Sequence, residues 1–237
     1  MVHASLSLPD PVEFTRRVPV FSAVKQRRQH QSNIWFFDSP KINRRIVITG
    51  DVAFMHFVLL EGDISVSGYD PDPPAVYASI DGETRQTKLD AHVYFKDRDV
   101  EWWEFKRLQD SGPGRSGRSK SQLSAQAQAA SEAGVRYRVQ TDLELKHKEI
   151  LFDNWLNLCA CMTRCRNQPM HREADILFEV LSRQKSIRFG TLLLNYPGID
   201  PALMIAAAAL ALQNGLATTD LEKAFFGYDS VLTRRES

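Results

Sequence analysis

The chain has 237 residues, of which 43% are hydrophobic, and its formal net charge is +1. That composition is ordinary for a globular protein, so we expect one or two domains whose cores need no disulfide or metal staple. The sequence has neither an apolar run of about 18 residues nor the apolar core of a signal peptide, which predicts a soluble, intracellular protein without a membrane partner.

Charge is distributed unevenly along the chain although the total is close to zero. Residues 14–45 carry eight Lys or Arg and one acid, whereas residues 49–84 carry seven acids and no Lys or Arg. A basic segment beside an acidic one is the pattern expected of a protein that grips DNA and also holds cations. Plain solvated surface is the alternative.

Residues 1–45 are predicted to form an irregular basic arm, because Pro9, Pro11 and Pro19 discourage a helix there. Lys and Arg side chains on such an arm can contact backbone phosphates, whose charge dominates non-specific DNA affinity. Docking onto a partner subunit is the alternative use.

A mixed α/β domain is predicted over residues 46–148. Apolar residues at helical spacing predict a helix at 51–61, and the Asp81-Gly82 pair predicts a hairpin turn. The other predicted elements are strands at 64–67, 76–80, 84–89, 91–95 and 100–106, a helix at 122–133 and a strand at 135–141. The Gly- and Ser-rich segment 110–124 is predicted as a loop over bound DNA, or as a solvated linker, and carries Arg115, Arg118 and Lys120.

An all-α, winged-helix-like domain is predicted over residues 149–237. Helices are expected at 150–165, 172–182, 186–194 and 202–213, followed by two short wing strands at 216–221 and 230–233. Residues two apart on a helix do not share a face, so the C-x-C-x₃-C set does not suit zinc and reads as reduced thiols: Cys159, Cys161 and Cys165.

The segment from Asp90 to Lys106 is predicted to form a β-hairpin around a polar turn. Since successive side chains of a strand point to opposite faces, Glu104 and Lys106 share one face, beside Asp90 at the start of the first strand. Two carboxylates on adjacent strands can hold Mg²⁺ against a phosphate, and Lys106 can assist the attacking water or neutralise developing charge. The alternative is a solvated salt pair on an exposed strand face.

The order Asp90, Glu104, Lys106 resembles the signature of the PD-(D/E)xK restriction-endonuclease-like nucleases. The run ITGDVAFMHFVLLEGDISVSGYDPDPP at residues 48–74 is similar to the opening of TnsA-type transposase endonuclease subunits, with the Leu-Leu-Glu of that opening at 59–61. The sequence is therefore identified as similar to the TnsA type over most of its length.

The resemblance implies a restriction-endonuclease-like α/β (α+β) nuclease core followed by the winged-helix-like domain. It implies a Mg²⁺-dependent DNA endonuclease, with Mn²⁺ as a substitute, that hydrolyses phosphodiesters at the 5′ ends of a transposon. The implied partners are double-stranded transposon-end DNA, a DDE-type transposase subunit that cuts and joins the 3′ ends, and an ATPase regulator that contacts the C-terminal domain. The implied location is the bacterial cytoplasm, in association with the nucleoid. Asp90 and Glu104 would hold the metal, and Lys106 would complete the catalytic set.

One position departs from the family pattern. The family carries a further acid at the start of its helix, which helps bind a second metal ion, and that place falls near Thr49. Asp51 can substitute after a small shift and is the expected third metal ligand, or else it is an acid that complements the helix dipole. Gln122 or Gln126, on the helix after the site lysine, is expected to face the site.

Two rival functions stay open from the sequence. The first is a catalytically weak or inactive scaffold of the same fold that binds DNA or a partner, which the departure near Thr49 favours. The second is another nuclease of this fold, of the restriction or repair type.

Overall fold

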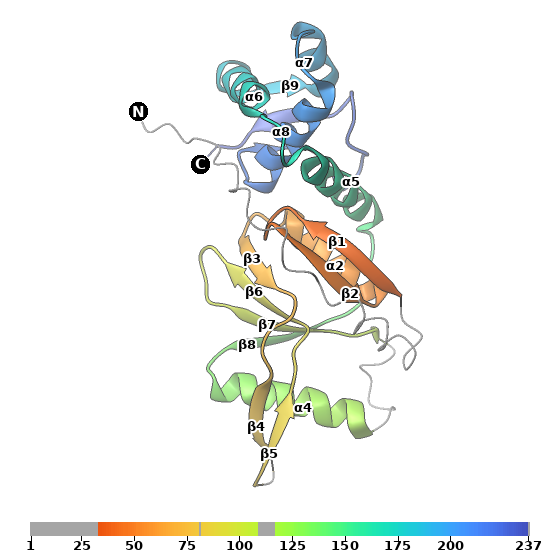
Figure 1. Cartoon of the computed structure of the whole chain (residues 1–237), viewed down its shortest axis with the longest axis vertical. Coiled ribbons are helices and arrows are strands. Elements are labelled where there is room, and N and C mark those ends of the chain that lie inside the picture. The colour runs from red at the N-terminus through yellow and green to blue at the C-terminus, as the bar shows by residue number, and fades with distance from the viewer. Residues whose placement is uncertain (1–32, 81, 109–116, 237) are drawn as a thin grey trace.

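The computed structural model describes residues 33–80, 82–108 and 117–236. Figure 1 shows the main β-sheet in the lower half of the molecule and a mainly helical region in the upper half. The basic arm predicted over residues 1–45 lies outside the described residues as far as residue 32. The loop predicted at 110–124 lies outside the described residues as far as residue 116, Arg115 included. Its remainder, with Arg118 and Lys120, lies in the helix Gly117–Glu132, so the loop prediction was wrong for that part.

The described chain begins with a hairpin of β1 (Ile34–Ser39) and β2 (Arg44–Thr49), which pair antiparallel. The prediction of an irregular arm up to residue 45 was therefore wrong for this part. Phe37 of β1 and Ile46 and Ile48 of β2 are buried in the core. Burial of these side chains favours the paired strands over an irregular segment.

Helix α2 (Asp51–Gly62) follows, as the sequence predicted. It packs on one face of the sheet, where Phe57 lies 5.2 Å from Phe105 between ring centroids. His56 stacks on the same Phe105 ring, and its Nε2 lies 2.9 Å from the backbone oxygen of Thr141. His56 is therefore a hydrogen-bonded residue of the helix that packs in the core.

The central sheet has the strand order β3–β6–β7–β8. Its strands are β3 (Val66–Asp70), β6 (Ala91–Phe95), β7 (Glu101–Phe105) and β8 (Arg136–Gln140). Strand β6 pairs antiparallel with both β3 and β7. Strand β8 follows the crossover helix α4 (Gly117–Glu132) and runs parallel to β7. The predicted strand pair around the turn at 96–99 is confirmed as β6 and β7.

A second hairpin, of β4 (Val76–Ile80) and β5 (Glu83–Thr87), is inserted between β3 and β6. Ala78 on this hairpin packs against Ala125 and Ala129 of α4. In Figure 1 the hairpin runs down in front of α4, away from the four-stranded sheet.

The C-terminal region contains four helices and a small sheet of order β10–β11–β9. The elements are α5 (Glu149–Cys165), α6 (His171–Gln184), β9 (Ser186–Arg188), α7 (Phe189–Asn195), α8 (Pro201–Gln213), β10 (Ala217–Thr218) and β11 (Val231–Arg234). The region is thus not all-α, and the predicted helix at 186–194 begins as a strand. Ile187 is buried opposite Leu232 of β11, which explains why the start of this segment forms a strand paired with β11 instead of a helix.

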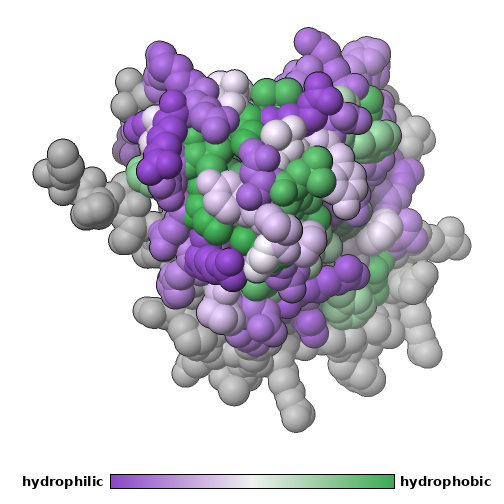
Figure 2. Space-filling view, turned by 90° about the horizontal axis from the view of Figure 1, so that it is seen from above, coloured by the Kyte–Doolittle hydropathy of each residue, from purple (hydrophilic) through white to green (hydrophobic). Residues whose placement is uncertain are grey.

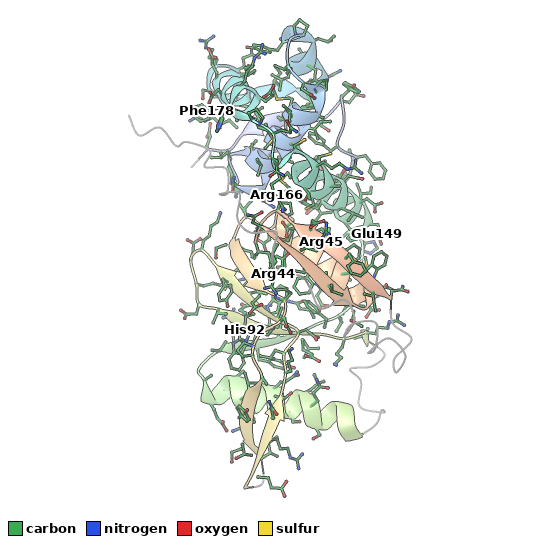
Figure 3. All side chains as sticks on the ribbon, viewed as in Figure 1. Arg44, Arg45, His92, Glu149, Arg166 and Phe178 are labelled. Carbon is green, nitrogen blue, oxygen red and sulfur yellow. The ribbon has the colours of Figure 1, made fainter. Side chains whose placement is uncertain are left out.

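Helix α5 joins the two halves, because it packs against α2 on one side and α8 on the other. Gly62 at the end of α2 is required there, since a Cβ atom at that position would lie 2.1 Å from the Trp155 ring of α5. Figure 3 shows Arg166, which follows the last residue of α5. Its guanidinium group donates to the backbone oxygen of Ser39 at 3.4 Å.

Apolar side chains also reach the outer face of the C-terminal region. Figure 2 shows them gathered inside a hydrophilic rim at the upper end of the molecule. A hollow of about 240 Å³ in this region has an apolar lining that includes Phe189, Leu193, Ile205, Phe225 and Tyr228. Over the residues that the structure describes, no helix combines the length and apolar character needed to cross a membrane.

Candidate active site

Asp90 and Glu104 are brought together by the pairing of β6 with β7. The backbone N–H of Asp90 donates to the Trp103 oxygen at 3.1 Å, and the backbone N–H of Phe105 donates to Asp90 Oδ2 at 2.7 Å. These two bonds tie the start of β6 to the end of β7. The Asp90 carboxyl group is therefore held against the strand that carries Glu104.

The two carboxyl groups lie close enough to repel each other in a largely buried site, where Glu104 is 1% exposed. Burial first, and then the charge of Glu104, raises the pKa of Asp90 to about 7. Two carboxylates in contact repel each other unless a proton or a cation lies between them. At neutral pH the pair therefore has affinity for positive charge.

Lys106 supplies a cation next to this pair. Its Nζ lies 2.7 Å from Glu104 Oε1, and its side chain is partly exposed. The backbone N–H of Lys106 donates to the Gln140 oxygen at 2.9 Å, which fixes the end of β7 against β8. The predicted shared face of Glu104 and Lys106 thus places their charged groups in direct contact.

Two glutamines of α4 cover the same carboxylate. Gln126 Nε2 donates to Glu104 Oε2 and to the Lys88 backbone oxygen, both at 2.7 Å, and Gln122 Nε2 donates to Glu104 Oε1 at 3.3 Å. The sequence predicted that one of these glutamines faces the site, and both do.

Tyr137 of β8 is a member of the site that sequence reasoning missed. Its hydroxyl donates to Gln126 Oε1 at 2.8 Å, which turns the amide so that its NH₂ group points at Glu104. Burial, followed by the charges of Glu104 and Asp90, raises the pKa of Tyr137. Tyr137 pairs with Trp102 of β7, and side chains two apart on a strand share a face, so Tyr137 lies on the same face of the sheet as Glu104. The alternation of side chains along β8 was therefore a sequence signal that could have identified Tyr137.

Asp51 has different neighbours. It lies in the first turn of α2, and its Oδ1 accepts hydrogen bonds from Asn33 Nδ2 and Trp35 Nε1, each at 2.9 Å. These contacts tie the helix start to β1. The structure thus brings Asp90, Glu104 and Lys106 together and shows Asp51 bonded to β1.

His92 lies two residues beyond Asp90, in the lower half of the molecule (Figure 3). Its ring stacks on Trp102 at 5.2 Å, and burial lowers the pKa of the imidazole. Among the described residues, its Nε2 is a buried polar atom without a hydrogen-bond partner. The neutral ring therefore adds no charge beside the carboxyl pair.

The donor set suits a single hard cation. Mg²⁺ commonly takes one or two protein carboxylates and fills its remaining positions with water and substrate phosphate oxygens. Asp90 and Glu104 supply such a pair. Within residues 33–80, 82–108 and 117–236, no group of three or more His, Cys, Asp or Glu side chains is placed to hold a metal ion.

A second buried carboxylate, Glu61 of α2, is fully enclosed by donors. Its oxygens accept from Ser39 Oγ, from the Lys41 backbone N–H at 2.9 Å, from Tyr69 OH at 2.6 Å and from Gln213 Nε2 at 3.0 Å. Gln213 is the last residue of α8, so this cluster joins the two halves of the molecule. We call it the Glu61 cluster.

Glu101 at the opposite end of β7 is a third buried carboxylate. Trp103 Nε1 donates to it at 3.0 Å, Arg138 Nε lies 3.0 Å away and Arg136 Nη1 lies 3.4 Å away. Like Glu61, it is satisfied by protein donors alone.

No known family model matches the chain, and no curated protein matches its sequence.

Proposed function

We propose that the protein is a Mg²⁺-dependent DNA endonuclease of the PD-(D/E)xK type. The observation that carries this proposal is the placement of Asp90, bonded to the Phe105 N–H at 2.7 Å, beside the buried Glu104, with Lys106 Nζ 2.7 Å from Glu104. Phosphodiester hydrolysis needs stabilisation of negative charge and a positioned water, and these groups can provide both.

The order of elements around the site supports the proposal. A helix (α2), three antiparallel strands (β3, β6 and β7), a crossover helix (α4) and a parallel strand (β8) follow one another, apart from the inserted β4–β5 hairpin. This is the arrangement expected for a restriction-endonuclease-like core, in which the acid and the E-x-K sequence lie on neighbouring strands.

Each residue then has a role in the hydrolysis of a phosphodiester. Asp90 and Glu104 would hold Mg²⁺, and a bound Mg²⁺ supplies Lewis-acid stabilisation of charge on the phosphate. Lys106 orients or deprotonates the attacking water, or neutralises charge on the phosphate. Gln126, held by Tyr137, fixes the orientation of the Glu104 carboxylate.

The more specific proposal is a TnsA-type transposase subunit that cuts the 5′ ends of a transposon in the bacterial cytoplasm. The order of α6, β9, α7, α8, β10 and β11 is that of a winged helix. Its third helix, α8, is almost entirely buried, from Ala206 to Ala209 in particular, so it cannot insert into a DNA groove. That burial favours docking of a partner protein, the ATPase regulator, on this region, and the DDE-type transposase is the second partner of the proposed complex.

A nicking assay tests the proposal. The full chain would be incubated with transposon-end DNA and Mg²⁺, with and without the transposase partner, as wild type and as Asp90→Ala. We expect cleavage at the 5′ end that disappears with Asp90→Ala, and an Asp51→Asn variant decides whether Asp51 is a third ligand. Wild-type protein that binds DNA or its partner without cutting would contradict the proposal.

The bonding of Asp51 to β1 favours a second candidate, a non-catalytic scaffold that binds DNA or a partner. A scaffold has no use for two buried carboxyl groups in contact, and replacing them would leave its binding unchanged. Equal DNA or partner binding by wild type and Asp90→Ala, without cutting by either, is the outcome that selects this candidate.

A further inference from the structure

The β4–β5 hairpin has two unlike faces. One face packs on α4 through the buried Ala78. On the other face Tyr77 pairs across the strands with Gln86, and Ser79 pairs with Thr84. All four of these side chains are exposed, Tyr77 by 61%.

The outward face carries hydrogen-bonding groups without charge. Each of its four side chains has both a donor and an acceptor, in three hydroxyl groups and one amide. A glutamine amide can bond an adenine edge at two points, and serine or threonine hydroxyls can bond any base. A two-stranded β-ribbon also fits the major groove of B-DNA, which is about 12 Å wide.

The base of the hairpin is fixed to the candidate active site. The backbone oxygen of Lys88 accepts from Gln126 Nε2 at 2.7 Å, and the same Nε2 donates to Glu104. Lys88 Nζ is also paired with Asp72, beyond the end of β3. The Gln126 amide therefore fixes the position of the β4–β5 hairpin relative to the carboxyl pair.

The spacing sets where the hairpin would meet DNA. Gln86 precedes Asp90 by four residues in the sequence, which corresponds to about 13 Å at roughly 3.3 Å per extended residue. One base pair of B-DNA rises about 3.4 Å, so this distance spans about four base pairs. Tyr77 lies opposite Gln86 and is at the same level.

We propose that the outward face of the β4–β5 hairpin reads base edges in the major groove about four base pairs from the bond that is cut. The residues that would do so are Tyr77, Ser79, Thr84 and Gln86. This inference rests on the proposed nuclease function and assigns the sequence preference of that function to one hairpin.

The first test is a cleavage selection on a pool of duplexes with a randomised central segment, in Mg²⁺. Wild-type products should show a base preference about four base pairs from the cut, and Tyr77→Ala with Gln86→Ala should reduce it about five- to hundred-fold. The matched control is Tyr228→Ala with Gln128→Ala, which removes an exposed tyrosine and glutamine elsewhere. An unchanged preference in the hairpin variant would overturn the inference.

The second test keeps the inference separable from the proposed hydrolysis. A photoreactive benzophenone side chain is placed at position 77 and, as the control, at position 228, and each protein is irradiated with a plain duplex. We expect crosslinks to bases from position 77 only. Cutting without crosslinks from position 77 overturns the hairpin inference and leaves the nuclease intact, whereas the absence of both cutting and crosslinks overturns both.

Discussion

Glu61 and Glu104 are both buried carboxylates, but their surroundings differ in kind. Glu61 accepts hydrogen bonds from four protein donors. Glu104 also has protein donors, in Gln122, Gln126 and Lys106, but it faces a second carboxyl group, that of Asp90. Burial raises the pKa of Glu61 although four donors pair its oxygens, whereas a facing carboxyl group adds like-charge repulsion that a proton or a cation relieves. Burial therefore does not distinguish a structural acid from a reactive one, whereas the partners of the acid do.

The largest expected effect is on stability, at the Glu61 cluster. Glu61→Ala should lower the free energy of unfolding by about 3–5 kcal/mol, because its buried donors lose their acceptor at the junction of α2 and α8. Urea denaturation measures this. The exposed Glu132→Ala is the control and should change stability by less than about 0.5 kcal/mol. A loss below about 1 kcal/mol for Glu61→Ala would contradict the structural role.

A smaller effect is expected at the amide that supports the carboxyl pair. Gln126→Ala should reduce the cleavage rate about 10- to 100-fold, since outer-shell partners orient the groups that bind a metal ion. Gln128→Ala, on the exposed face of the same helix, should leave the rate unchanged. The experiment compares single-turnover rates at saturating Mg²⁺, and equal rates for the two variants would remove Gln126 from the site.

The smallest expected effect is a gain in stability at the site itself. The raised pKa of Asp90 means that the folded protein keeps a proton up to about pH 7 that the unfolded chain releases near its ordinary pKa of 3.8. Metal-free wild type should therefore lose stability as the pH rises through this range, and Asp90→Asn should lack that loss. At pH 8 the variant should be more stable than wild type by about 1 kcal/mol, as expected when a strained functional group is replaced. Thermal unfolding at a series of pH values measures both, and a less stable variant would contradict the account.

The sequence predicted the elements that carry strong local patterns. Helix α2, the β4–β5 and β6–β7 hairpins and helix α8 were all visible in spacing and turn residues. The strand β9 was not, because its pairing with β11 depends on residues more than 40 positions away. The same limit applies to β1 and β2, whose stability comes from packing on α2 and α5.

The candidate site could be predicted in part for the same reason. Glu104 and Lys106 are two residues apart on one strand, so alternation alone places them together. Tyr137 reaches the site only through the parallel pairing of β8 with β7, and local sequence does not encode that pairing. The buried state of Glu61 likewise depends on Gln213, which is 152 residues away.

The most direct test of the central claim is a titration of the metal-free protein with Mn²⁺, followed by electron paramagnetic resonance of the free ion. Binding should weaken below pH 7, about tenfold per pH unit, because the cation must displace the proton that the carboxyl pair shares. We expect one site per chain in wild type and in Asp51→Asn, and its loss in Asp90→Asn. Mn²⁺ binding that is absent in wild type, or that is equally strong in Asp90→Asn, would contradict a metal site at Asp90 and Glu104.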